Sequence, residues 1–158
     1  MGMSIRMAPG VARPLLAIAA SLIVAAVLAL PAAARAAPSV AVTEAWAREA
    51  RQGEVSAAYM TLTNSGDADD VLLEARSDVA AATEVHQTSM QAGVMRMGPA
   101  GPITVPAGGT VSFRPGGYHV MLIGLTQDLP AGAELQLTLV FEQSGEIMVP
   151  LTVRGAGG

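Results

Sequence analysis

From Ser39 onward the sequence consists of short apolar runs, most of which end at Gly, Pro, Asp or Asn. No stretch of a dozen residues has a convincing helical period of apolar positions, so amphipathic helices are not predicted. The run Glu134–Glu142 alternates polar and apolar residues through most of its length, which is typical of a strand with one face on a core and one in water. Many short strands with regular turn signals predict an all-β fold, either a β-sandwich or a barrel.

Nine strands are predicted, and turn-forming residues separate most of them. The predicted strands are 40–47, 56–63, 71–77, 84–88, 94–97, 110–113, 119–125, 134–142 and 147–153. Gln91-Ala92-Gly93 suits a hairpin turn, and further turns are predicted at 64–67, 106–109 and 115–117. Residues 77–82 also fit a short helical turn, because their three alanines favour neither structure strongly.

The first 36 residues resemble an export signal rather than part of a folded domain. Arg6 and Arg13 precede an uncharged, almost wholly apolar run from Leu15 to Leu30, and Ala34-Arg35-Ala36 places small residues where a signal peptidase would cleave. The apolar run is short of the roughly 20 residues that a membrane-spanning helix needs. We therefore predict that 1–36 is a signal peptide that is removed, rather than a retained anchor.

Removal of that segment would leave 122 residues, which we predict to form one domain at 37–154 with a short flexible tail at 155–158. We predict a periplasmic location and no stable membrane insertion after cleavage. Six arginines then face thirteen acidic residues, a net charge of −7 that disfavours nucleic acid and anionic membranes as partners. The chain has no cysteine, so it forms no disulfide and carries out no thiol chemistry.

A window from His86 to Met121 contains both histidines of the chain and four of its nine methionines. These methionines are Met90, Met95, Met97 and Met121. Imidazole nitrogen and thioether sulfur form a soft donor set, which without a thiolate favours Cu(I) over Zn²⁺, Ca²⁺ or Mg²⁺. One residue separates His119 from Met121, and one separates Met95 from Met97, so each pair would leave one face of a strand. The donors could converge if the segment around His86 pairs with one of these strands.

Other residues have simpler interpretations. A lone methionine on a strand is more often a packing residue than a ligand, and we predict packing for Met60 and Met148. Trp46 and Tyr59 are interpreted as core aromatics. The acidic residues between 67 and 70 lack the glutamate of a calcium loop and are predicted to form a solvated turn. No nucleophile elbow or Gly-rich phosphate loop is present in the sequence, so an enzyme is not predicted.

The spacing of four soft donors resembles a known motif. His86, ten residues, Met97, twenty-one residues, His119, one residue and Met121 match the H-x10-M-x21-H-x-M pattern of the periplasmic copper chaperone family PCuAC. The segments 57–64, 93–97 and 115–121 are similar to that family too. The resemblance implies a cupredoxin-like β-sandwich or barrel that binds one Cu(I). The implied ligands are His86, Met97, His119 and Met121, with Met90 and Met95 as candidates for the surroundings of the ion.

The resemblance further implies a metallochaperone that passes Cu(I) to a copper centre of cytochrome oxidase or to another copper chaperone. Gln87 and Thr88 stand where family members often have a methionine, and residues 155–158 lack the His- and Met-rich tail that adds a Cu(II) site in many of them. We therefore predict one Cu(I) site. Two alternatives stay open: an exported β-sandwich binding or adhesion module whose methionines only pack, and a copper electron carrier or copper enzyme. Blue-copper electron transfer needs a Cys thiolate, which this chain lacks.

Overall fold

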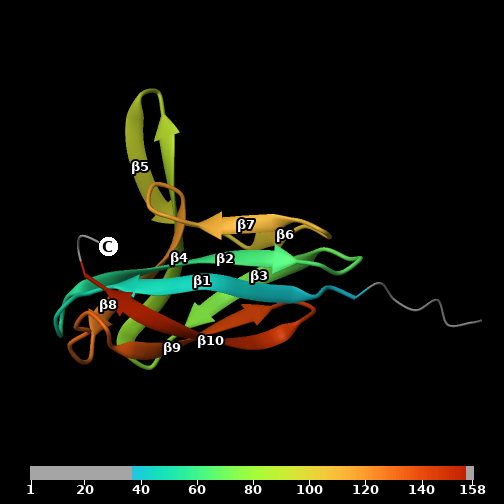
Figure 1. Cartoon of the computed structure of the whole chain (residues 1–158). Helices are drawn as coiled ribbons and strands as arrows, with labels where there is room; N and C mark the ends of the chain where they lie inside the picture. Colours follow the sequence, from blue (N-terminus) through green and yellow to red (C-terminus); the bar gives the residue numbers. More distant parts are fainter. Residues whose placement is uncertain (1–36, 156–158) are drawn as a thin grey trace, which may run out of the picture. The chain divides into compact units, whose positions relative to one another are not determined.

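The computed structural model describes residues 37–155, and every regular element in that range is a β-strand. The strands are β1 (Val40–Arg48), β2 (Val55–Asn64), β3 (Asp70–Arg76), β4 (Ala80–Gln91), β5 (Val94–Pro99), β6 (Ile103–Val105), β7 (Thr110–Phe113), β8 (Tyr118–Leu125), β9 (Glu134–Phe141) and β10 (Gly145–Arg154). They form one sheet in the order β5-β4-β8-β7-β2-β1-β10-β9-β3-β6 (Figure 1). The all-β prediction is confirmed, and the helical turn considered at 77–82 is wrong, since β4 begins at Ala80.

Two segments for which the sequence makes predictions lie at the ends of the chain. The predicted signal peptide at 1–36 and the last three residues of the predicted tail lie outside the described residues. Within residues 37–155, no helix could cross a membrane.

The alternation in β9 and β10 shows why these residues form strands. Leu135, Leu137 and Leu139 of β9 are at most 5% exposed, and the residues between them face outward or are only partly covered. β10 has the same pattern, with Val149 and Leu151 buried. Because side chains alternate between the two faces of a strand, this sequence can bury only one face of each strand. Burial of one such leucine or valine stabilises the fold by about 1.5–3 kcal/mol.

The sheet folds over on a shared core. β2 pairs with β8 through its first half and with β7 through its second half. β3 contacts β4, although the two strands lie near opposite ends of the sheet order. The buried cluster accordingly combines Leu72 of β3 and Leu139 of β9 with Val120 and Leu122 of β8. The site-bearing strand β8 is therefore fixed from behind by the main core.

Several sequence predictions about single residues need correction. Met60 is buried as predicted, but Met148 is 67% exposed because it lies on the outer face of β10 beside buried Val149. Trp46 is only partly buried, whereas Tyr59 is buried. The short strand β6 was not predicted at all.

Asp70 is buried and is not part of a solvated turn, contrary to the prediction. Its carboxylate accepts hydrogen bonds from the backbone N–H groups of Val71, Gln143 and Ser144 at 2.8–3.0 Å. Burial alone would raise the pKa of this carboxyl, but the hydrogen bonds from Ser144, Gln143 and Val71 outweigh it and hold the pKa below its ordinary value of 3.8. Asp70 thus fastens the start of β3 to the turn between β9 and β10.

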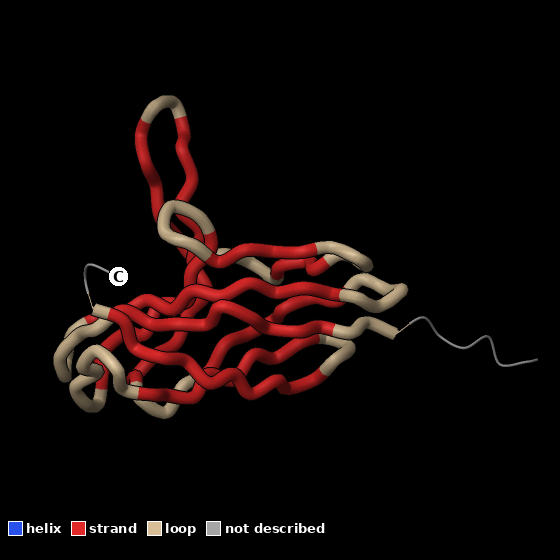
Figure 2. Tube along the Cα trace, in the orientation of Figure 1, coloured by secondary structure: helices blue, strands red, loops and turns tan. Residues whose placement is uncertain are grey.

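The β4–β5 hairpin extends beyond the rest of the sheet. β4 pairs with β8 as far as Gln87, and Thr88 N–H still donates to the Gly117 carbonyl, whereas the outer part of the hairpin, 89–96, pairs only with itself. Figures 1 and 2 show this two-stranded ribbon standing out from the other strands. Its turn is the one predicted from the sequence: Ala92 and Gly93 both have positive φ, 49° and 78°, as a two-residue type I′ hairpin turn requires.

Candidate metal centre

His86 and His119 lie directly opposite each other on neighbouring antiparallel strands. They are register partners on β4 and β8, and their ring centroids are 6.0 Å apart. The adjacent same-face pairs are Glu84 with Met121 on β8, and Thr88 with Met97 on β5. Strand pairing therefore brings the four motif residues from three strands to one face of the sheet. Each pair of same-face residues inferred from the sequence has this geometry in the fold.

A tight turn before β8 sets the orientation of the His119 ring. The N–H of Gly117 donates to the carbonyl of Arg114 at 3.0 Å, and Gly116 has a φ of 82°, which with Pro115 defines a type II turn. The Gly117 carbonyl accepts from His119 Nδ1 at 3.1 Å. A carbonyl can only accept, so in the neutral imidazole Nδ1 carries the proton and Nε2 has the lone pair.

Met97 approaches that free lone pair. His119 Nε2 and Met97 Sδ are 3.1 Å apart, and His119 is only 5% exposed. Two such donors on a four-coordinate d¹⁰ ion, about 2.0 and 2.3 Å from it, would lie about 3.5 Å apart. A small opening of the Met97 side chain would therefore let both atoms bind one ion.

Glu84 orients the His86 ring, in which the roles of the two nitrogens are the reverse of those in His119. The Nε2–H of His86 donates to Glu84 Oε2 at 2.8 Å, whereas His86 Nδ1 is buried and has no hydrogen-bond partner among residues 37–155. A carboxylate on one ring nitrogen fixes the tautomer and raises the basicity of the other nitrogen, as it does for many metal-binding histidines. Sequence reasoning missed Glu84. The available signal was its position two residues before His86 on the same strand face.

A cavity of about 350 Å³ lies against three of the four motif residues. Its lining includes Met97, His119 and Met121, together with Arg48, Tyr59, Thr88, Pro115 and other residues of β2 and the turn before β8. His86 is next to His119 but does not line this cavity. Met90 and Met95 lie farther out on the hairpin, 65% and 66% exposed, and are also outside the cavity.

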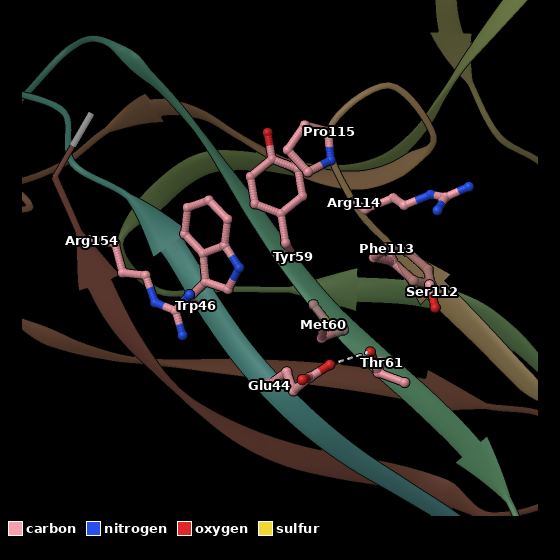
Figure 3. A pocket seen from close by; sticks show the side chains of 10 residues that line it. All are labelled: Glu44, Trp46, Tyr59, Met60, Thr61, Ser112, Phe113, Arg114, Pro115 and Arg154. Atoms are coloured by element: carbon pink, nitrogen blue, oxygen red, sulfur yellow. Dashed lines mark hydrogen bonds between the residues drawn. The ribbon is translucent and has the colours of Figure 1, made fainter. Parts of the chain in front are cut away.

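A second cavity, of about 360 Å³, adjoins this one and shares Tyr59 and Pro115 with it. Figure 3 shows its lining: Trp46 is beside Tyr59, and the Arg154 side chain lies close to the Trp46 ring. The Trp46 and Tyr59 ring centroids are 4.6 Å apart, and the Arg154 guanidinium is 5.1 Å from the Trp46 centroid. The partly buried tryptophan therefore borders an open cavity and is not a core residue.

Thioethers are essential to the candidate site, because the oxygen and nitrogen donors alone are too few. Among residues 37–155, no group of three His, Cys, Asp or Glu residues could hold a metal ion. A metal at the opposed histidines would need sulfur from Met97 or Met121 to complete its coordination. This composition favours a soft, monovalent ion over Zn²⁺ or Ca²⁺.

The fold places the chain in a class of small copper-related β-domains. It is similar to the copper-bound PCuAC domain from PmoF2, with a TM-score of 0.62 and 28% identity over 73% of this chain and 92% of that domain. It is also similar to the Cu(I) form of DR1885 from Deinococcus radiodurans, with a TM-score of 0.52 and 34% identity over 78% of this chain and 83% of that protein. The chain has the cupredoxin-like fold of PCuAC domains.

The chain belongs to the LpqE-like family, described as "Putative lipoprotein LpqE-like", whose model matches residues 40–153. It is 33% identical over 123 residues to "Putative lipoprotein Lxx21020" from Leifsonia xyli subsp. xyli, covering 77% of this chain and 74% of that protein. It is 35% identical over 113 residues to the uncharacterized protein RP573 from Rickettsia prowazekii, covering 68% of this chain and 62% of that protein.

Proposed function

We propose that this protein is an exported copper chaperone that carries one Cu(I) on His86, Met97, His119 and Met121. The main support for the proposal is that the two nitrogens of each imidazole, in His86 and in His119, have different roles. In each ring one nitrogen is bound to an oxygen acceptor, and the other has a lone pair for an ion: Nδ1 of His86 and Nε2 of His119. The similarity to copper-bound and Cu(I)-bound PCuAC proteins supports the choice of metal.

The ring separation suits a shared ion. Each imidazole centre lies about 3 Å from a metal whose nitrogen distance is about 2.0 Å. Rings whose centroids are 6.0 Å apart can therefore bind one ion placed between them. Met97 Sδ is already next to His119 Nε2, and Met121 follows His119 on the same face of β8.

Neutral thioethers and imidazoles favour transfer over permanent storage. They stabilise Cu(I) without the strong bond that a thiolate forms, so an acceptor with cysteine ligands can take the ion down a free-energy gradient. On the PCuAC resemblance, the acceptor is a copper centre of cytochrome oxidase or another copper chaperone. A periplasmic location after removal of residues 1–36 belongs to the same proposal, and the lipoprotein names of the relatives fit export.

Competition titration with a Cu(I) chelator under anaerobic conditions tests the proposal. The protein should bind one tight equivalent, and the His86→Ala/His119→Ala variant should lose it. The control is Met148→Leu, which changes an exposed methionine on β10 outside the motif and should leave the affinity unchanged. No tight binding, or binding that survives in the double-histidine variant, would favour a metal-free binding module.

Two further measurements address the carrier role. The Cu(I) form should show no reversible Cu(II)/Cu(I) couple in voltammetry, whereas an electron carrier would show one. Mixing the loaded protein with the soluble copper-binding domain of a cytochrome oxidase subunit should move copper to that domain, measured as the copper content of each protein after separation. Copper that stays on the chaperone would argue against this acceptor.

A further inference from the structure

The outer β4–β5 hairpin carries three exposed thioethers. Met90, Met95 and Met97 are 65%, 66% and 59% exposed, and all residues from 90 to 97 are exposed. Isolated exposed apolar residues are common on protein surfaces, but here three methionines occur within eight residues of a ribbon that covers no core. Their side chains therefore contribute little by burial, and packing does not explain their presence.

Register places the three methionines on one face of the ribbon. Met90 and Met95 are direct cross-strand partners, and Met97 follows Met95 by two residues. The turn Ala92-Gly93 is flanked by the pair Gln91 and Val94, so the Met90–Met95 pair is the next, non-hydrogen-bonded one, in which Cα atoms are about 4.5 Å apart and side chains are closest.

The opposite face of the same ribbon carries polar side chains and one exposed valine, Val94. The side chains of Ser89 and Arg96, which are register partners, alternate with the methionines and leave from that face. The three methionines thus share one face of the ribbon, with Thr88 beside Met97.

The spacing allows the three sulfur atoms to reach one ion. Met95 and Met97 have Cα atoms about 7 Å apart along the strand. A methionine side chain has three rotatable bonds and adapts its length and direction to such a gap. Three thioethers form a soft donor set that Cu(I) accepts and harder divalent ions do not.

We propose that Met90, Met95 and Met97 form an outer Cu(I) site on the hairpin, weaker than the inner one and sharing Met97 with it. Copper passes through this outer site on its way to and from the histidines. Met97 can bridge the two sites because its sulfur already lies 3.1 Å from His119 Nε2. The relay role depends on the proposed inner site, whereas copper binding by the hairpin thioethers does not.

The transfer is a ligand exchange. The Cu–S bonds to Met90 and Met95 break, the bond to Met97 is kept, and bonds from the lone pairs of His119 and His86 and from the Met121 sulfur form. All donors are neutral and copper stays Cu(I), so no oxidant, reductant or proton is consumed. Met90, Met95 and Met97 are also more exposed than the histidines, so ligands of a partner protein can reach copper there first.

The outer site is tested by NMR of protein labelled with ¹³C at the methionine methyl groups. In the His86→Ala/His119→Ala variant, added Cu(I) should shift the Met90 and Met95 resonances and leave that of Met148, an internal reference, in place. The single variant His86→Gln should show the same two shifts when Cu(I) is added, which covers the case of a poorly folded double-histidine variant. Absence of these shifts would overturn the outer site.

The relay is tested by the rate of copper removal. Met90→Leu/Met95→Leu keeps the size and exposure of both side chains but removes their sulfur. This variant should bind its tight equivalent with unchanged affinity, and a chelator should remove the copper about tenfold more slowly, equivalent to about 1.4 kcal/mol of barrier. Met148→Leu is the matched control and should release copper at the wild-type rate. An unchanged rate in the double variant would overturn the relay, whereas no tight binding in any variant would instead refute the inner site.

Discussion

The body of the sheet and the outer part of its β4–β5 hairpin are both built of β-strands, but the body buries its side chains and the outer hairpin exposes them. In the body, strands such as β9 bury alternate leucines at 0–5% exposure against a shared core. In the hairpin, residues 90–97 are all exposed, and the ribbon is held by cross-strand pairing and a two-residue turn. A two-stranded ribbon without a core is at best marginally stable by itself.

The comparison shows that stability and ligand chemistry are divided between the two regions. The body supplies rigidity, because the back of β8 packs on the core through Val120 and Leu122. The hairpin places the sulfur of Met97 beside His119 of β8, on a ribbon that does not pack on the core. The proposed Cu(I) site at this junction would combine histidines backed by the core with thioethers on a ribbon that has no core of its own.

The largest effect is expected from the body. Leu139→Ala, at a position with 0% exposure, should lower the free energy of unfolding by about 2–5 kcal/mol, since it removes buried apolar area and leaves a cavity. Urea denaturation measures this change. Leu73→Ala, at a position 51% exposed on β3, is the control and should cost far less. If both variants lost equal free energy of unfolding, burial in the core would not explain the stability of the body.

The next effect concerns copper affinity. His119→Ala should weaken Cu(I) binding by at least about 100-fold, since loss of a ligand exceeds the 10–100-fold cost of losing a neighbouring hydrogen-bond partner. Competition titration provides the measurement. Gln87→Ala, beside His86 but on the opposite face of β4, should bind copper normally. Similar losses in both variants would mean that general disruption, rather than ligation, is responsible.

Asp70 should make the stability of the body depend on pH. Its native pKa lies below 3.8, so the ionised carboxylate contributes stability above that pH, and this contribution is lost as the pH falls through the native value. At pH 7, Asp70→Asn should cost about 1–3 kcal/mol, because backbone donors lose a charged acceptor. Denaturation curves from pH 7 to pH 3 should show the difference from wild type shrinking in acid. The exposed Asp67→Asn variant should show no comparable difference.

Glu84 tests the histidine pair of the proposed site, which lies where β4 pairs with β8. Glu84→Gln should weaken Cu(I) binding by about tenfold, because a neutral amide polarises the His86 ring less than a carboxylate does. Glu134→Gln, an exposed change of the same kind on β9, is the control. An unchanged Cu(I) affinity in Glu84→Gln would show that the 2.8 Å contact does not support ligation.

The smallest effect is expected at the hairpin turn. Gly93 has a φ of 78°, and alanine there should destabilise the hairpin by about 1 kcal/mol through backbone strain. Hydrogen exchange of the hairpin amides should accelerate by about fivefold, with no change in global unfolding. Gly98→Ala is the matched control, since it lies on the same ribbon without a positive φ and has open space for the methyl group. Coupled loss of global stability would show that the hairpin belongs to the cooperative core.

Much of the fold could be predicted from local patterns. Alternation predicted β9, and turn residues predicted the hairpin at Ala92-Gly93, because both signals are local and periodic. Strand β6 was missed because its three residues lie between Pro102 and Pro106 and carry almost no periodicity. The start of β4 was missed because an alanine run has no strand preference of its own, and only pairing with β8 makes it extended.

The sequence by itself determined that His86, Met97, His119 and Met121 stand at motif spacing and that paired donors share strand faces. Only the tertiary structure decided that β4 pairs with β8 in the register that sets His86 opposite His119, and that Glu84 and the Gly117 carbonyl each bind one ring nitrogen. The exposure of Met148 and the burial of Asp70 were decided in the same way. The physical reason is that face parity is a property of one strand, whereas register, burial and hydrogen-bond partners depend on contacts between segments far apart in the chain.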